Sequence, residues 1–155
     1  MNIWYVHPYL GVPDNAEYGR GYLLGSALAK LDVQLRVITS SFHHLIQSDY
    51  DQQELVFSKK ISDVHFSWIK TPKYKNNGLK RIINMFTFGW RFRWVDLVKD
   101  HSHEKPDVII ITSTHPFHIF GGIYYSKKYN AKLICEIRDL WPLSLNEILG
   151  VSTFH

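Results

Sequence analysis

Short apolar runs alternate along the chain with longer stretches in which apolar residues recur every three or four positions. A short apolar run between polar or turn-forming residues is typical of a buried strand. Strands are predicted at residues 2–6, 33–39, 64–69 and 107–112, with a fifth around residues 133–135. The runs at 107–112 and 133–135 are dense in aliphatic side chains, which favours strands covered on both faces.

Helical spacing occupies the stretches between several of these runs. Residues 20–31 and 79–99 each present apolar residues at a period that predicts a helix with one buried face. A third helix is predicted near Pro116, and its inner face is expected to carry the following residues: Phe117, Phe120, Ile123 and Tyr124. Residues 144–147 have capping-box spacing, which predicts a short final helix.

Residues 40–60 lack a firm period and are largely polar. We expect a long loop there, with at most a short helical piece. The overall alternation predicts one α/β domain over residues 1–155, built on a mainly parallel sheet. A chain of 155 residues can bury roughly two-thirds of its unfolded surface, which is enough for a core of its own.

The composition also indicates the cellular compartment to expect. The single cysteine, Cys135, excludes an internal disulfide and is expected to be a buried thiol within the fifth strand. No stretch resembles a signal peptide or reaches the ~20 apolar residues of a membrane span. We therefore expect a cytoplasmic protein, and its net charge of +4 is too small to specify a partner by itself.

Polar residues follow the predicted strands at their carboxyl ends. They include His7, His115, and the neighbours Arg138 and Asp139. Because parallel strands bring these ends to one edge of the sheet, where open α/β sheets bind ligands, we expect a binding site there.

Gly19, Arg20 and Gly21 open the first predicted helix and form a candidate phosphate cradle. The dinucleotide fingerprint is not met, because a loop separates these glycines from the first strand and no acidic residue ends the second strand. The alternative is that Gly19 and Gly21 only permit a turn.

Five segments together resemble the amino-terminal domain of family-4 glycosyltransferases, particularly enzymes that add amino sugars such as N-acetylfucosamine during O-antigen or capsule assembly. They are His-Pro-Tyr at 7–9, Tyr-Gly-Arg-Gly-Tyr-Leu-Leu at 18–24, Trp-Ile-Lys-Thr-Pro-Lys-Tyr at 68–74, Thr-His-Pro-Phe at 114–117 and Glu-Ile-Arg-Asp-Leu-Trp-Pro at 136–142.

The resemblance implies a Rossmann-like three-layer domain that forms one half of a GT-B fold. Such enzymes transfer sugar from a nucleotide-sugar donor with retention of configuration and usually without a metal cofactor. The expected acceptor is a lipid-linked glycan, and the family's carboxyl-terminal donor-binding domain is absent from the sequence. The chain is therefore expected to be the acceptor-side half of a lipopolysaccharide or capsule transferase. Alone it should be inactive, awaiting a separate donor-domain partner, or it is a non-catalytic binding module.

Each candidate site residue has a functional and a structural interpretation. Asp139 could orient or deprotonate an acceptor hydroxyl, or pair with Arg138. His115 could hydrogen-bond the sugar or a developing charge, or make a structural contact. Arg138 and Arg20 are candidates for phosphate contact, since a guanidinium suits oxyanions. His7 is a weaker candidate that could equally satisfy a turn.

Metal binding is not expected. The pairs His43-His44 and His101-Ser102-His103 lack a third ligand at a useful spacing.

Residues 70–99 combine basic and aromatic side chains with Asp96 as the one acidic residue. This composition suggests a surface for anionic lipid on the inner membrane. The basic residues expected to face the membrane are Lys73, Lys75, Lys80, Arg81, Arg91 and Arg93. The alternative is an ordinary helix whose aromatics fill the core, and no nucleic acid partner is expected.

Overall fold

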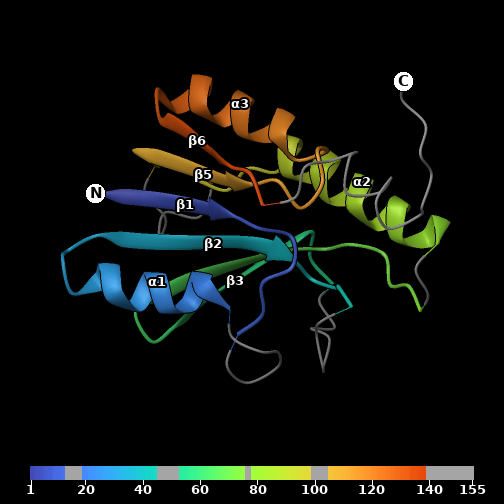
Figure 1. The fold of residues 1–155 in the computed structure, drawn as a ribbon, viewed down its shortest axis with the longest axis horizontal. Helices are drawn as coiled ribbons and strands as arrows, with labels where there is room; N and C mark the ends of the chain where they lie inside the picture. The colour runs from blue at the N-terminus through green and yellow to red at the C-terminus, as the bar shows by residue number, and fades with distance from the viewer. Residues whose placement is uncertain (13–18, 45–52, 76–77, 99–104, 139–155) are drawn as a thin grey trace, which may run out of the picture.

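The computed structural model describes residues 1–12, 19–44, 53–75, 78–98 and 105–138. These residues form a six-stranded sheet with helices on both faces (Figure 1). The elements in chain order are β1 Asn2–Val6, α1 Arg20–Ala29, β2 Gln34–Ser40, β3 Val56–Ile61, β4 Val64–Ile69, α2 Leu79–Trp94, β5 Val108–Thr112, α3 Ile119–Tyr129 and β6 Lys132–Glu136.

The strand order is β3-β4-β2-β1-β5-β6, and every pair except β3–β4 is parallel. The predicted α/β class, the mainly parallel sheet and the strands near residues 2–6, 33–39, 64–69, 107–112 and 133–135 are confirmed. The three helices also lie where their spacing placed them, although α2 ends at Trp94.

The expectation of a loop throughout residues 40–60 was wrong, because β3 occupies Val56–Ile61 at the edge of the sheet. β3 turns into β4 through Ser62, whose φ of 52° is in the left-handed region. Lys59 and Lys60 are exposed on this strand. An edge strand with one half-solvated face need not be strongly apolar, so its sequence gave a weak signal.

Two apolar clusters fill the space on either side of the sheet. The first includes Tyr5, Leu35 and Phe66, with Leu24 and Leu28 of α1 packed against it. The second includes Trp4 and Ile109 together with Phe88 and Phe92 of α2 and Tyr125 of α3. The fold is thus three-layered, as predicted, with α1 on one side and α2 and α3 on the other (Figure 1).

The helices α2 and α3 pack closely because glycines lie between them. A Cβ on Gly89 would stand 2.6 Å from the backbone carbonyl carbon of Phe117, and one on Gly121 would stand 2.4 Å from Phe92. On the sheet side, a Cβ on Gly122 would meet Ile111. Small residues at these positions bring α3 against both neighbours.

These glycines also overturn the predicted inner face of α3. Phe120 and Ile123 are exposed, whereas Gly121, Gly122 and Tyr125 are buried. The prediction placed the largest apolar residues on the inner face. In the structure the helix approaches its neighbours so closely that glycines occupy much of that face.

The expectation that β6 is buried on both faces was also wrong. Leu133, Ile134 and Cys135 are exposed, and β6 pairs with β5 alone within the described sheet. An edge strand has a neighbouring strand on one side only, and within the described part of the chain these apolar side chains stay exposed, so the predicted buried thiol is an exposed one.

None of the helices in the described part of the chain is long and apolar enough to cross a bilayer. The predicted final helix at residues 144–147 and the candidate Asp139 lie outside the described residues, as do His101 and His103.

Replacement of Gly89 by alanine should lower the free energy of unfolding by roughly 1–2 kcal/mol. The intrinsic helix gain of about 1 kcal/mol is outweighed by overpacking of about 2–3 kcal/mol, the upper part of the usual range, since the neighbour is rigid backbone. Urea denaturation measures the change. Gly78→Ala is the matched control, because nothing lies within 4 Å of its added methyl group. Equal or greater stability of Gly89→Ala would contradict the close α2–α3 contact.

Candidate functional site

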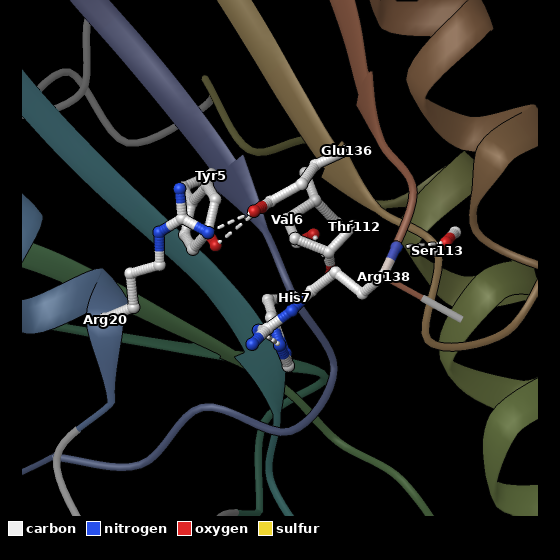
Figure 2. A network of polar contacts seen from close by, with 8 residues as sticks. All are labelled: Tyr5, Val6, His7, Arg20, Thr112, Ser113, Glu136 and Arg138. Atoms are coloured by element: carbon white, nitrogen blue, oxygen red, sulfur yellow. Dashed lines mark hydrogen bonds and ion pairs between the residues drawn. The ribbon is translucent and has the colours of Figure 1, made fainter.

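The carboxyl ends of β1, β5 and β6 meet beside the start of α1 (Figure 2). Strand pairing sets this arrangement, because Val6 lies opposite Ile111 and Thr112 lies opposite Glu136. Each strand then delivers a polar residue to the same edge. The sequence prediction that His7 and Arg138 lie at this edge is confirmed, and Arg20 of α1 lies beside them (Figure 2).

His7 and Arg138 are in direct contact. Arg138 Nη1 lies 3.0 Å from His7 Nε2, and the Arg138 backbone N–H donates to Ser113 Oγ at 2.9 Å. Burial, followed by the charge of Arg138, lowers the pKa of His7 to about 3, so the imidazole is neutral near pH 7.

A neutral imidazole has one nitrogen that accepts a hydrogen bond. His7 Nδ1 lies 3.1 Å from the Tyr9 backbone N–H, while His7 Nε2 faces the Arg138 guanidinium, which only donates. The two donors therefore compete for one acceptor. The exposed Arg138 guanidinium is consequently left with a donor surplus that an oxyanion would satisfy better than His7 does.

Arg20, the first residue of α1, forms an ion pair with Glu136 at the end of β6. Tyr5 donates to the other carboxylate oxygen of Glu136 at 3.1 Å. Burial and the nearby Glu136 carboxylate raise the pKa of Tyr5 to about 12, so its hydroxyl stays protonated and donates. Glu136 thus pairs with Arg20 and accepts from Tyr5.

His115 and His118 form a second cluster in the turn between β5 and α3. Their Nδ1 atoms lie 3.2 Å apart, and His118 Nε2 lies 2.7 Å from the carbonyl oxygen of Thr112. Both imidazoles are almost completely buried. Within this series of hydrogen bonds the role of the Thr112 carbonyl oxygen is fixed, because a carbonyl oxygen can only accept.

That carbonyl determines both tautomers. His118 must carry its hydrogen on Nε2 to donate to Thr112, and burial lowers its pKa to about 4, so its Nδ1 is an unprotonated acceptor. His115 must then donate from Nδ1. Burial lowers the pKa of His115 to about 2, so its remaining nitrogen, Nε2, carries a free lone pair.

His115 Nε2 is buried and has no hydrogen-bond partner among the described residues. Aromatic rings surround the imidazole, with ring centres at 6.0 Å for Tyr9, 6.2 Å for Phe88 and 5.6 Å for Phe117. Leaving a buried polar atom unpaired costs about 1–3 kcal/mol, so this acceptor suits a hydroxyl or water donor. The arrangement offers one directed hydrogen-bond acceptor in an apolar surrounding.

Tyr9 links the two clusters. Its ring lies 6.4 Å from His7 and 6.0 Å from His115, measured between ring centres. The guanidinium of Arg81 lies over the same ring, 5.9 Å from its centre. Arg81 was predicted to face a membrane, but this contact turns it from α2 toward the candidate site.

The glycines at the start of α1 lie against the apolar side of the same region. A Cβ on Gly21 would stand 2.5 Å from the Leu10 side chain, and one on Gly19 would stand 2.9 Å from it. Neither residue has a positive φ that requires glycine. Close packing therefore explains both glycines, and a phosphate contact at Gly19 or Gly21 stays a prediction.

Sequence reasoning found His7, Arg20, His115 and Arg138 but missed His118 and Tyr9. His118 follows His115 by three residues, a spacing that brings side chains together in a helical turn. Tyr9 gave no such signal, since its role depends on contacts with residues far away in the sequence.

No group of three or more histidine, cysteine, aspartate or glutamate side chains suited to hold a metal is found in residues 1–12, 19–44, 53–75, 78–98 and 105–138. Comparisons of the chain with protein families, with curated proteins and with solved structures found no match.

The buried histidines should make stability fall in mild acid. An unfolded histidine has a pKa of about 6.5, so each buried one stabilises the fold fully above that pH and progressively less below it. Between pH 7.5 and 5.5 each contributes a loss of about 1.4 kcal/mol.

Urea denaturation at the two pH values measures this loss in the wild type and in His115→Gln. The variant should lose about 1.4 kcal/mol less than the wild type. His65→Gln is the comparison, because burial also lowers the pKa of His65 but leaves it partly exposed on β4, so its effect should be smaller than that of His115→Gln. An identical loss in His115→Gln and wild type would contradict a buried, neutral His115.

Proposed function

We propose that this chain is the acceptor-side half of a retaining glycosyltransferase that uses a nucleotide-sugar donor in surface polysaccharide biosynthesis. The likeness of its sequence segments to family-4 enzymes suggests this class, and the three-layer fold is compatible with one half of a GT-B enzyme. The site chemistry supports the proposal independently of that likeness.

The single observation that carries the proposal is His115 Nε2, which has no hydrogen-bond partner in the described part of the chain. A neutral imidazole with a fixed lone pair accepts a hydrogen bond from a hydroxyl group, and sugars present hydroxyl groups. The neighbouring rings of Tyr9 and Phe88 make its surroundings apolar, which strengthens such a bond. His115 therefore orients a sugar hydroxyl in this proposal.

Arg138 supplies the complementary charge. Its guanidinium lies at the same edge of the sheet and is held by His7, a weak partner for a cation. A phosphate oxygen of a nucleotide sugar or of a lipid-linked acceptor would replace His7 as its partner. Arg20 remains paired with Glu136, so it positions β6 and α1 relative to each other before it serves any ligand.

The donor-binding half would be a separate polypeptide or a further part of a longer protein. In the family that the sequence resembles, transfer usually needs no metal cofactor. Asp139 directly follows Arg138 in the sequence. In this proposal its carboxylate orients or deprotonates the hydroxyl group of the acceptor sugar. A lipid-linked glycan acceptor would bring the chain to the cytoplasmic face of the inner membrane.

The second candidate is a non-catalytic module that holds a lipid-linked sugar. It uses the same hydrogen-bond acceptor, His115 Nε2, and the exposed apolar side chains of α2, but it needs no nucleotide-sugar donor. The two candidates differ in one outcome, which is whether sugar is transferred.

The test combines the chain with a donor-binding domain of a family-4 transferase, supplied as a separate polypeptide. Labelled UDP-N-acetylglucosamine is the probe donor and an undecaprenyl-diphosphate-linked sugar is the acceptor. We expect labelled lipid to form only when both polypeptides are present. His115→Ala should slow its formation by about 100-fold, the scale of one positioned hydrogen-bonding group, whereas His65→Ala should not.

Binding of the acceptor is measured in parallel by titration calorimetry. Binding without transfer would overturn the transferase and leave the binding module. Absence of both transfer and binding would overturn both candidates. Transfer at the wild-type rate by His115→Ala would overturn the role of His115.

A further inference from the structure

The outer side of α2 is apolar and exposed along its full length. Its members recur every three or four residues, so they lie on one side of the helix. They are Leu79, Ile83, Phe86, Trp90 and Trp94, and Ile82 stands beside them. Trp90 and Trp94 expose 58% and 62% of their surface. We name the five residues the outer stripe.

The opposite side of α2 is already used by the core. Asn84, Phe88 and Phe92 are buried there. Asn84 donates to the Thr71 hydroxyl at 3.0 Å, and Phe92 packs on Tyr125 of α3. The core therefore contacts the opposite side of α2. The outer stripe is a second apolar side of the helix, and the described residues leave it uncovered.

The apolar surface continues onto α3. Phe120 is 70% exposed, and the Phe117 ring that precedes it packs on Phe86 with ring centres 5.8 Å apart. Gly121 lies directly against Phe92 of α2, so the two helices leave no gap where they cross. Monomeric soluble proteins rarely expose continuous apolar surface of this kind without a partner.

The charge around this surface is mostly positive, although the exposed Asp96 lies two residues after the end of α2. The described residues of α2 and α3 include basic side chains but no aspartate or glutamate. Arg93 stacks over the rings of Trp94 and Tyr124, at 4.5 and 3.4 Å from their centres. Lys128 lies 5.8 Å from the centre of the Tyr124 ring. A basic rim thus borders the outer stripe at its carboxyl end, and Lys80 borders it at the amino end.

We propose that the outer stripe, with Phe120, docks on an anionic phospholipid bilayer. Apolar and aromatic side chains enter the interface while Lys80, Arg93 and Lys128 contact lipid phosphates. Charge complementarity selects this occupant, because the basic residues around the stripe outnumber Asp96 and match an anionic leaflet. Tryptophan suits this position, since its ring is apolar and its N–H is polar.

Docking in this way places the candidate site close to the bilayer. Arg81 projects from the inner side of the same helix onto Tyr9, and Phe88 packs on His115. One helix thickness, about 10 Å, therefore separates the bilayer surface from the site. This inference does not depend on sugar transfer, because it rests on the surface of α2 and α3.

Vesicle flotation tests the proposal with the whole chain. One set of vesicles is phosphatidylglycerol and the other is phosphatidylcholine. We expect binding to the first set only, with release at high salt. Trp90→Ser with Trp94→Ser should weaken binding at least about tenfold, because two inserting side chains are lost. Leu23→Ser with Leu31→Ser is the matched control, as these exposed leucines belong to α1 and the turn after it.

A charge pair completes the design. Lys80→Gln with Lys128→Gln should weaken binding roughly tenfold, and Lys59→Gln with Lys60→Gln on β3 should leave it unchanged. Failure of the wild-type protein to bind either type of vesicle would overturn the proposal. So would equal binding by wild type and the tryptophan double variant. Light scattering gives the third overturning result: a wild-type dimer that Trp90→Ser with Trp94→Ser converts to a monomer would assign the stripe to a second copy.

Discussion

The parallel pairing of β1 with β2 on one side and β5 on the other is the constraint on which the rest of the structure depends. It buries β1 completely after its first residues and leaves both faces of the sheet to be covered by helices. It also fixes where each strand ends. His7 follows β1, the turn with His115 follows β5, and β6 extends the same edge toward Arg138. Strand register therefore sets where the candidate site lies, and the turn between β5 and α3 brings His115 and His118 together within it.

Within that site, one backbone carbonyl sets the chemistry. The oxygen of Thr112 at the end of β5 fixes the tautomer of His118, and His118 fixes that of His115. Burial keeps both imidazoles neutral, so the lone pair at His115 Nε2 is a permanent feature of the fold at neutral pH. A buried acceptor without a protein partner destabilises the chain, and a ligand hydroxyl would relieve that cost.

The sequence predicted the class of fold, all the parallel strands and the convergence of His7 and Arg138, because apolar periodicity and strand order determine them. It failed where packing decided. The phenylalanine at 120 was assigned to the inner face of α3, yet Gly121 and Gly122 take that face because α3 approaches Phe92 and Ile111 closely. The strand β3 was not predicted, because an edge strand needs little apolar character. The strand β6 was predicted to be covered on both faces because its residues are apolar, but it is exposed. Tyr9 and Arg81 join the site through contacts that no local pattern encodes.

The helix α2 connects both proposals, since one side carries Arg81 and Phe88 to the site and the other carries the outer stripe. The central claim is the free lone pair of His115, and nitrogen-15 NMR of histidine side chains measures it most directly. The account predicts that at pH 7 His115 carries hydrogen on Nδ1 only, and that its Nε2 resonance shifts when a lipid-linked sugar binds. A His115 protonated on Nε2, or an Nε2 resonance unmoved by a sugar that does bind, would contradict it.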